Sequence, residues 1–337
     1  MRKKNNQEDI LVSVIIPIHN AGEWLERCLD TLMNQTLSAV EFICVLDCPT
    51  DGSDITVESY AEFDKRFVIL KNEVNAGVSA SRNKGLLAAR GEYIGFSDHD
   101  DWREPDMYEK LYKQAKKEEA DIVFSNSFVE EGCNSTLVVY KNPTWEGVVK
   151  SIFLPMFSHH SENFLAKSVW ASIYKRTAVL NSRAAFGDRK KYWEEDSLFN
   201  FTMFSYTTKI AYCKLPFYHW NLNRTALTAN YEKVTSIEVL LNTFRTMSAM
   251  LNNLSINKKE ILKKRFLSVA FYHYYYHYRN YSITQLQHLI RQEEYPYLSI
   301  FYSEANVFSN FNVRQVIGRV LKLIKFYLFI RRIKQHD

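Results

Sequence analysis

Short apolar runs alternate with helical patterns along the first part of the chain. Four of these runs are rich in β-branched and aromatic side chains and end at a proline or at polar residues, namely 11–17, 42–46, 67–70 and 93–96. Runs of this length and composition are typical of strands buried on both faces of a parallel sheet. A similar run predicts a further strand at 121–124.

Apolar residues recur at helical spacing between these runs. A helix that opens near residue 21 carries them on one face, at Trp24, Leu25, Cys28, Leu29 and Leu32. Further helices are predicted from residue 55, after residue 77 through Ala89, and near Pro105. Strands that alternate with helices predict an α/β fold with a mostly parallel, doubly wound sheet. Ligands of such sheets collect at the carboxyl ends of the strands.

Polar side chains follow the predicted strands directly. Asn20 comes just after the first strand and its Pro17, Asp47 follows the second strand, and Asp98 and Asp100 follow the fourth. Because the carboxyl ends of parallel strands meet at one edge of a sheet, these residues are predicted to converge on one rim.

Three carboxylates stand within four residues, at Asp98, Asp100 and Asp101. Carboxylates this close repel one another. A divalent cation with oxygen ligands, such as Mg2+ or Mn2+, relieves that repulsion and keeps positions open for phosphate oxygens. The other interpretation of these residues is an acidic turn that caps the helix near Pro105.

Composition limits the class of protein. With 337 residues, 46% apolar and 24% charged, the chain is neither disordered nor a bundle of membrane spans. The net charge of +5 is weighted towards the C-terminus, which argues against a nucleic-acid groove. Five cysteines without a C-x-x-C pair indicate reduced thiols, and no secretory signal is recognised, so a cytoplasmic location is expected.

Four segments carry a resemblance to a known family, namely 13–20, Asp47 with 50–53, 75–85, and 91–101. In this order and at this spacing they resemble the family 2 glycosyltransferases with the GT-A fold, such as the bacterial capsule and lipopolysaccharide sugar transferases. The resemblance implies a UDP-sugar donor, Mn2+ or Mg2+ on its diphosphate, a glycan or glycolipid acceptor, and inversion at the anomeric carbon.

The same resemblance implies roles for single residues in the first half. Pro17 would line the uracil pocket through its backbone, with Asn20 on the donor side, and Asp47 would hydrogen-bond the base. Arg82 would face the donor; a surface or structural arginine is the alternative. Asp98 would meet the ribose or the metal.

Asp100 would bind the metal itself. The chain departs from the family pattern near the base, since Leu46 stands where many relatives have an acidic residue and Cys48-Pro49 replace Gly-Ser.

The second half carries the candidate base. Glu195 and Asp196 stand where the family places its catalytic pair before a helix, and Asp196 is the expected base. Without the resemblance, the favoured interpretation of this pair is acidic residues that complement the dipole of a helix N-terminus. His219 and Arg224 are candidates for contacts with the diphosphate.

Three regions are expected. Residues 1–125 form the nucleotide-sugar-binding half, 126–234 the acceptor-side half, and 235–337 a helical region with a basic amphipathic end. Residues 313–334, wound as a helix, separate apolar from basic side chains. That pattern fits a helix lying on an anionic membrane, at the inner face of the cytoplasmic membrane, and equally one that packs on the domain.

Two other functions remain at this point. A sugar-phosphate nucleotidyltransferase also uses an α/β sheet with metal-binding carboxylates, but residues 18–22 lack the Gly-rich loop with a basic residue that it needs after the first strand. A catalytically degenerate scaffold in an envelope-polymer complex is disfavoured by the presence of Asp98, Asp100 and Asp196. Neither the sugar, the acceptor, the linkage nor the oligomeric state follows from the sequence.

Overall fold

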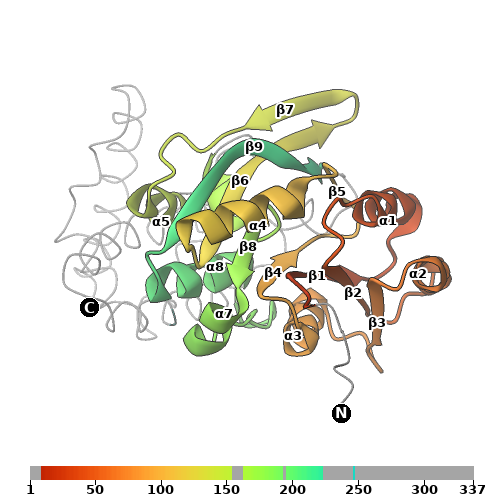
Figure 1. The fold of residues 1–337 in the computed structure, drawn as a ribbon. Coiled ribbons are helices and arrows are strands. Elements are labelled where there is room, and N and C mark those ends of the chain that lie inside the picture. The colour runs from red at the N-terminus through yellow and green to blue at the C-terminus, as the bar shows by residue number, and fades with distance from the viewer. Residues whose placement is uncertain (1–8, 154–161, 193–194, 223–245, 247–337) are drawn as a thin grey trace, which may run out of the picture. The chain divides into compact units, whose positions relative to one another are not determined.

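The computed structural model describes residues 9–153, 162–192, 195–222 and 246. In its first part strands and helices alternate as predicted (Figure 1). The bounds are β1 (Val12–Ile18), η1 (Gly22–Trp24), α1 (Leu25–Met33), β2 (Val40–Leu46), α2 (Ser53–Phe63), β3 (Phe67–Lys71), α3 (Val78–Ala88) and β4 (Tyr93–Phe96).

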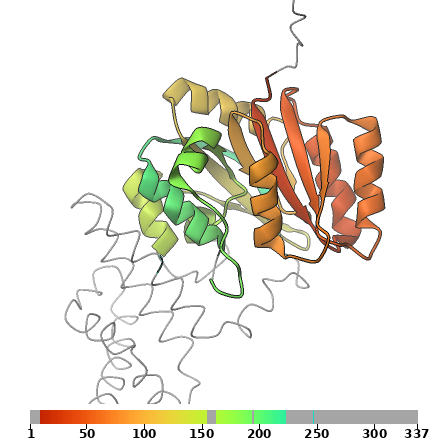
Figure 2. The same cartoon turned by 90° about the horizontal axis from the view of Figure 1, so that it is seen from below.

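The first four strands form a parallel sheet in the order β3-β2-β1-β4. From β1 to β3 the chain adds each strand on the same side of the previous one, and right-handed crossovers place α1 and α2 on one face of the sheet. From β3 it returns to β4 on the other side of β1, and the same handedness places α3 on the opposite face. Figure 2 shows these strands between α3 and the other two helices. Both β1 and β2 are buried along their whole length as a result. The strand order reverses between β1 and β4, which is where α/β sheets bind ligands.

Helix α3 buries small and polar side chains in place of an apolar stripe. Its buried residues are Ser79, Ser81, Arg82 and Gly85. A methyl group on Gly85 would overlap the side chain of Ile15 in β1. The glycine therefore allows a close approach of α3 to the sheet, and this approach brings the long side chain of Arg82 to the carboxyl ends of the strands.

The second part of the chain extends the same sheet. Its elements are β5 (Trp102–Arg103), α4 (Met107–Glu118), β6 (Ile122–Glu131), β7 (Asn134–Val138), α5 (Trp145–Phe153), α6 (Glu162–Lys167), β8 (Ser172–Lys175), α7 (Arg176–Ser182), α8 (Glu195–Tyr206) and β9 (Ile210–Asn221). Beyond β4 the order is β8-β6-β9-β5, and β7 pairs with β6 as a hairpin that projects from the sheet (Figure 1). Strand β8 is antiparallel to both β4 and β6.

An aromatic cluster joins the two parts of the sheet. Phe96, the last residue of β4, contacts Tyr174 of β8, Phe199 of α8 and Phe186, with ring centroids 5.1–5.9 Å apart. Phe186 and Phe199 stack on each other at 4.6 Å. Burial of these large rings fixes α8 against β4, so the start of α8 lies near the end of β4.

The α/β fold predicted from the sequence is confirmed, with the predicted strands and helices close to their observed bounds. Nearly all of the predicted helical region 235–337 lies outside the described residues. Among the residues that the structure describes, no helix has the length and apolar character needed to cross a membrane.

Candidate functional site

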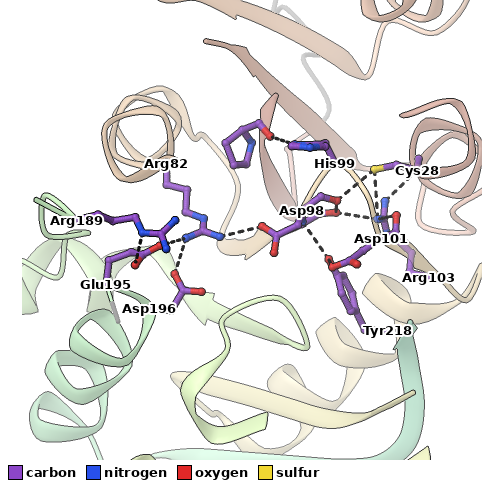
Figure 3. Close-up of polar contacts among 12 residues, drawn as sticks. Cys28, Arg82, Asp98, His99, Asp101, Arg103, Arg189, Glu195, Asp196 and Tyr218 are labelled. Atoms are coloured by element: carbon purple, nitrogen blue, oxygen red, sulfur yellow. Dashed lines mark hydrogen bonds and ion pairs between the residues drawn. The ribbon is translucent and has the colours of Figure 1, made fainter. Parts of the chain in front are cut away.

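The acidic segment after β4 forms a turn at the carboxyl edge of the sheet. Pairing of β4 with β1 ends at Phe96, so the chain leaves the sheet at Ser97 and runs through Asp98–Asp101 to the short strand β5. We call residues 98–101 the acidic turn. Figure 3 shows that the side chains of Asp98 and Asp101 point in different directions. Asp98 binds Arg82, whereas Asp101 binds Tyr218.

Asp101 points into the protein and does not share the metal-binding role predicted for Asp98 and Asp100. Its side chain is buried and accepts hydrogen bonds from the Tyr218 hydroxyl at 2.7 Å and from the Asn221 N–H at 2.8 Å. Burial raises the pKa of Asp101 well above its usual range, and the charges of Asp100 and Asp98 raise it further. Asp101 is thus a structural carboxylate that the protein itself satisfies.

Asp100 has the opposite environment. Its carboxylate accepts no hydrogen bond from the side chains or backbone of other described residues. Burial raises its pKa, His99 opposes that effect, and the charge of Asp98 adds to it. A partly buried, unpartnered carboxylate next to a second carboxylate suits an oxygen-ligated divalent ion. Within the described ranges, no three His, Cys, Asp or Glu side chains are arranged to hold a metal by themselves, so ligand oxygens would have to complete the shell.

Arg82 connects the acidic turn to the candidate base. Its Nη2 donates to Oδ1 of Asp98 at 2.8 Å and its Nη1 donates to Oδ1 of Asp196 at 2.5 Å, while Oε1 of Glu195 lies 3.6 Å from Nη1 (Figure 3). The arginine side chain is only 4% exposed. Burial lowers its pKa, but the three carboxylates outweigh burial and raise it overall. Arg82 is therefore a buried cation, and the surface-arginine interpretation of this residue is wrong.

Asp196 sits in the first turn of α8. Burial raises its pKa to about 7, Arg82 opposes this, and the charges of Glu195 and Asp98 support it. The side chain is still 24% exposed, so a solute can reach it. Glu195 turns towards Arg189, whose Nε lies 3.3 Å from Oε2 of Glu195. Asp196 thus has a pKa matched to accepting a proton near neutral pH.

Asp47 organises the loop that leads into α3. Its Oδ1 accepts from the Ala76 N–H and from Nδ2 of Asn72, and its Oδ2 accepts from the Gly77 N–H, all at 2.8 Å. Asp47 is only 3% exposed. These bonds fix the loop at the carboxyl edge of β2, where Asp47 was predicted.

Pro17 and Asn20 lie on the same rim. The Pro17 carbonyl accepts from Nδ1 of His99 at 3.1 Å, and its missing N–H is tolerated because β4 no longer pairs with β1 there. Asn20 has a φ of 46° and its Oδ1 accepts from the Thr50 N–H at 2.7 Å. The predicted convergence of Pro17, Asn20 and Asp47 with the acidic turn is thus observed.

His219 lies in a separate cluster. Its Nδ1 is 2.6 Å from Oε1 of Glu130 and its Nε2 is 3.0 Å from Oε1 of Glu104, and its ring stacks between Trp102 and Phe128. Both ring nitrogens are already engaged by carboxylates, so His219 does not join the other candidates. Arg224, the second diphosphate candidate, lies outside the described residues.

The sequence analysis missed Tyr218, a residue of the site, and Asn83, which holds Phe186 beside the Arg82 guanidinium. Tyr218 contacts the acidic turn from β9, and both polar atoms of the Asn83 amide pair with the backbone of Phe186 at 2.8–2.9 Å. Both partnerships join segments far apart in the sequence. A strand pattern around Phe217 to Trp220 would have placed Tyr218 on one face, but not against the acidic turn.

Comparisons with known proteins agree with this geometry. Residues 13–194 match glycosyl transferase family 2. The putative glycosyltransferase EpsH of Bacillus subtilis is 32% identical over 260 residues, which cover 74% of this chain and 72% of that protein.

Two solved structures share the fold. S. aureus TarS 1-349 in complex with UDP-GlcNAc has a TM-score of 0.66 at 20% identity, covering 85% of this chain and 78% of that one. The Pyrobaculum calidifontis mannosyltransferase PcManGT, in complex with GDP-Man and Mn2+, has a TM-score of 0.52 at 14% identity, covering 88% and 84%. The fold is the GT-A fold, and the chain belongs to glycosyl transferase family 2.

Proposed function

We propose that the protein is an inverting, metal-dependent glycosyltransferase that moves a sugar from a UDP-sugar to an acceptor hydroxyl. The observation that carries the proposal is the position of Arg82. One guanidinium binds both Asp98 of the acidic turn and Asp196 of α8. A base on one side and phosphate-directed carboxylates on the other are what an in-line displacement requires, since the nucleophile and the leaving group lie on opposite faces of the sugar.

In this reaction Asp196 accepts the proton of the acceptor hydroxyl as that oxygen forms a bond to the anomeric carbon. The bond from the anomeric carbon to the diphosphate oxygen breaks, and its electron pair leaves with UDP. Arg82 orients the Asp196 carboxylate and keeps part of it ionised near neutral pH by opposing the effect of burial. General-base assistance of this kind contributes about 10²–10⁴-fold in rate.

Asp100 and Asp98 are the residues proposed to hold Mn2+ or Mg2+. Support comes from the unpartnered carboxylate of Asp100 and from the Mn2+ bound by the mannosyltransferase of the same fold. When bound, the ion supplies positive charge that stabilises the diphosphate as it leaves.

The proposed donor is a UDP-sugar, hexosyl or N-acetylhexosaminyl. TarS has been solved with UDP-GlcNAc and with UDP. In the present chain Pro17, Asn20 and Asp47 line the edge of β1 and β2 where the nucleotide would lie, and Arg82 stands between them and the base. We do not assign His219 to the donor, because its nitrogens are engaged elsewhere.

The proposed acceptor is a glycan of a bacterial surface polysaccharide or a lipid-linked oligosaccharide, met at the cytoplasmic face of the membrane. The support is the sequence of residues 313–334, which lie outside the described residues and whose basic side chains would be attracted to an anionic surface.

A donor panel tests the proposed function. The full-length protein is incubated with Mn2+ and individual nucleotide sugars, and release of the nucleotide is measured. We expect UDP-sugars alone to be turned over, and Asp196→Asn to lose at least about 10²-fold in kcat with donor affinity kept. NMR of the product should show the anomeric configuration opposite to that of the donor. Retained configuration would exclude the single displacement, and no turnover of any donor would favour a scaffold.

A further inference from the structure

The backbone of the acidic turn is held by a tyrosine hydroxyl. Tyr218 accepts a hydrogen bond from the Asp98 N–H at 3.0 Å and donates one to Oδ2 of Asp101 at 2.7 Å. A single oxygen therefore bridges the first and last residues of the turn. The other carboxylate oxygen of Asp101 accepts from the Asn221 N–H, and the Asn221 side chain donates to the Asp100 carbonyl at 3.3 Å. Strand β9 thus contacts the turn at each end and in the middle.

Tyr218 is itself fixed in place. Its side chain is fully buried, and its ring stacks on Trp170 with centroids 4.4 Å apart. Strand β5, only two residues long, pairs Arg103 with Tyr218. Arg103 in turn donates to the Ser97 hydroxyl at 2.8 Å and to the Asp101 carbonyl at 2.9 Å. The hydroxyl therefore has a fixed position relative to the sheet.

These contacts give the three carboxylates of the turn different partners. Asp101 is satisfied by Tyr218 and Asn221, and Asp98 is held by Tyr218 at its backbone and by Arg82 at its side chain. Asp100 alone is left without a partner among the described residues. Partners of this kind, which hold a metal-binding group without touching the ion, set its orientation and hence the affinity for the ion.

We propose that Tyr218 is a positioning residue that sets the affinity of the acidic turn for a divalent cation bound to a diphosphate. The hydroxyl acts through Asp98 and Asp101 and does not touch the ion. This inference rests on the proposed function, because it requires Asp98 and Asp100 to face metal-bound UDP.

The test compares Tyr218→Phe with Tyr93→Phe. The first variant keeps the ring on Trp170 and removes only the two hydrogen bonds to the turn. The second is a matched control: Tyr93 is equally buried and lies in β4, the strand that leads into the turn, but its hydroxyl donates to the Ala120 carbonyl at 2.8 Å, away from the turn. Each protein is titrated with UDP at a series of Mn2+ concentrations and again without metal, and its melting temperature is measured.

We expect Tyr218→Phe to need about 10–100-fold more Mn2+ for half-maximal UDP binding, in line with the loss of other residues that orient metal ligands. Tyr93→Phe should keep the wild-type Mn2+ requirement even if its melting temperature falls as far. An unchanged Mn2+ requirement in Tyr218→Phe, or an equal change in Tyr93→Phe, would overturn the role of Tyr218 and leave the proposed function intact. A wild-type protein whose UDP affinity ignores Mn2+ would overturn both.

Discussion

Asp100 is the residue whose mutation should affect function without lowering stability. Because no described residue donates to its carboxylate, Asp100→Ala should leave the melting temperature unchanged or raise it, since a charge repelled by Asp98 is removed. The same change should abolish the Mn2+ dependence of UDP binding and turnover. Thermal unfolding and UDP titration with and without Mn2+ measure both effects.

Asp101→Ala is the control for that prediction. It leaves the buried Tyr218 hydroxyl and the Asn221 N–H without their acceptor, and an unsatisfied buried group costs about 1–3 kcal/mol. Asp101→Ala should therefore melt earlier than Asp100→Ala. If Asp100→Ala is the less stable of the two, or keeps Mn2+-dependent binding, the division of tasks within the acidic turn is wrong.

The raised pKa of Asp196 predicts how the reaction rate depends on pH. Its pKa is raised to about 7, so below that pH the carboxylate is protonated and cannot accept a proton. The ratio kcat/KM should rise about tenfold per pH unit on the acid side and level off above pH about 7. In Asp196→Asn this acid limb should vanish from the residual rate. A profile that stays flat down to pH 5 would show that Asp196 is not the base.

Some residues of the candidate site could be predicted from the sequence and others could not. Asp47, Asp98 and Asp100 could be named from the sequence because each follows a predicted strand, whereas Asp196 was named through the family resemblance. The opposite tasks of Asp100 and Asp101 could not, since adjacent carboxylates look alike until their partners are known. Those partners, Tyr218 and Asn221, are more than a hundred residues away along the chain.

Helix α3 shows how an element can control the site from outside it. A side chain at Gly85 meets Ile15 of β1, so Gly85→Ala must move α3 away from the sheet. Because Arg82 belongs to the same helix, the movement should disturb its bonds to Asp98 and Asp196 as well as destabilise the fold. We expect Gly85→Ala to lose kcat at a temperature where it is still folded, measured by activity and circular dichroism together.

Leu87→Ala provides the comparison on the same helix. Its side chain is 89% exposed, so this change should alter neither stability nor kcat appreciably. A Gly85→Ala protein with wild-type kcat would mean that Arg82 tolerates displacement of its helix.

Elements differed in how far they could be predicted. Three of the four strands before residue 100, β1, β2 and β4, are fully buried, and all four are short apolar runs between clear breakers, so their pattern alone identifies them. Strands β8 and β9 went unpredicted. β8 has only four residues, and β9 mixes buried and exposed positions with a proline and two bulged registers against β6, so neither carries a regular period.

For the whole molecule, the first predicted half could be predicted because its strands and helices alternate regularly along the chain, although β1 pairs with the distant β4. The half predicted to face the acceptor depends on β6, β8 and β9, which pair out of sequence order. Sequence periodicity contains no information about such pairings. What could be predicted of this half, the pair Glu195 and Asp196, came from the family resemblance. The site itself is assembled from both halves by Arg82.

The membrane proposal is tested on the intact protein. If residues 313–334 lie on an anionic surface, the full-length protein should sediment with phosphatidylglycerol-containing liposomes at low salt and be released at high salt, because screening weakens the attraction. A truncation ending near Ser309 should remain folded and stay in the supernatant. Liposome binding that ignores salt, or a truncation that aggregates, would assign the segment to the core of the protein.

The tight turn between β6 and β7 has a practical consequence. Gly132 and the exposed Cys133 form its tip, and a chain cut there yields one piece with Arg82 and the acidic turn and another with Asp196. If Arg82, Asp98 and Asp196 act together as proposed, neither piece would transfer sugar alone. The β-sheet and the aromatic rings around Phe96 would hold the two pieces together once they meet. Fused to two interacting proteins, the pieces would make a split reporter whose sugar product records that encounter.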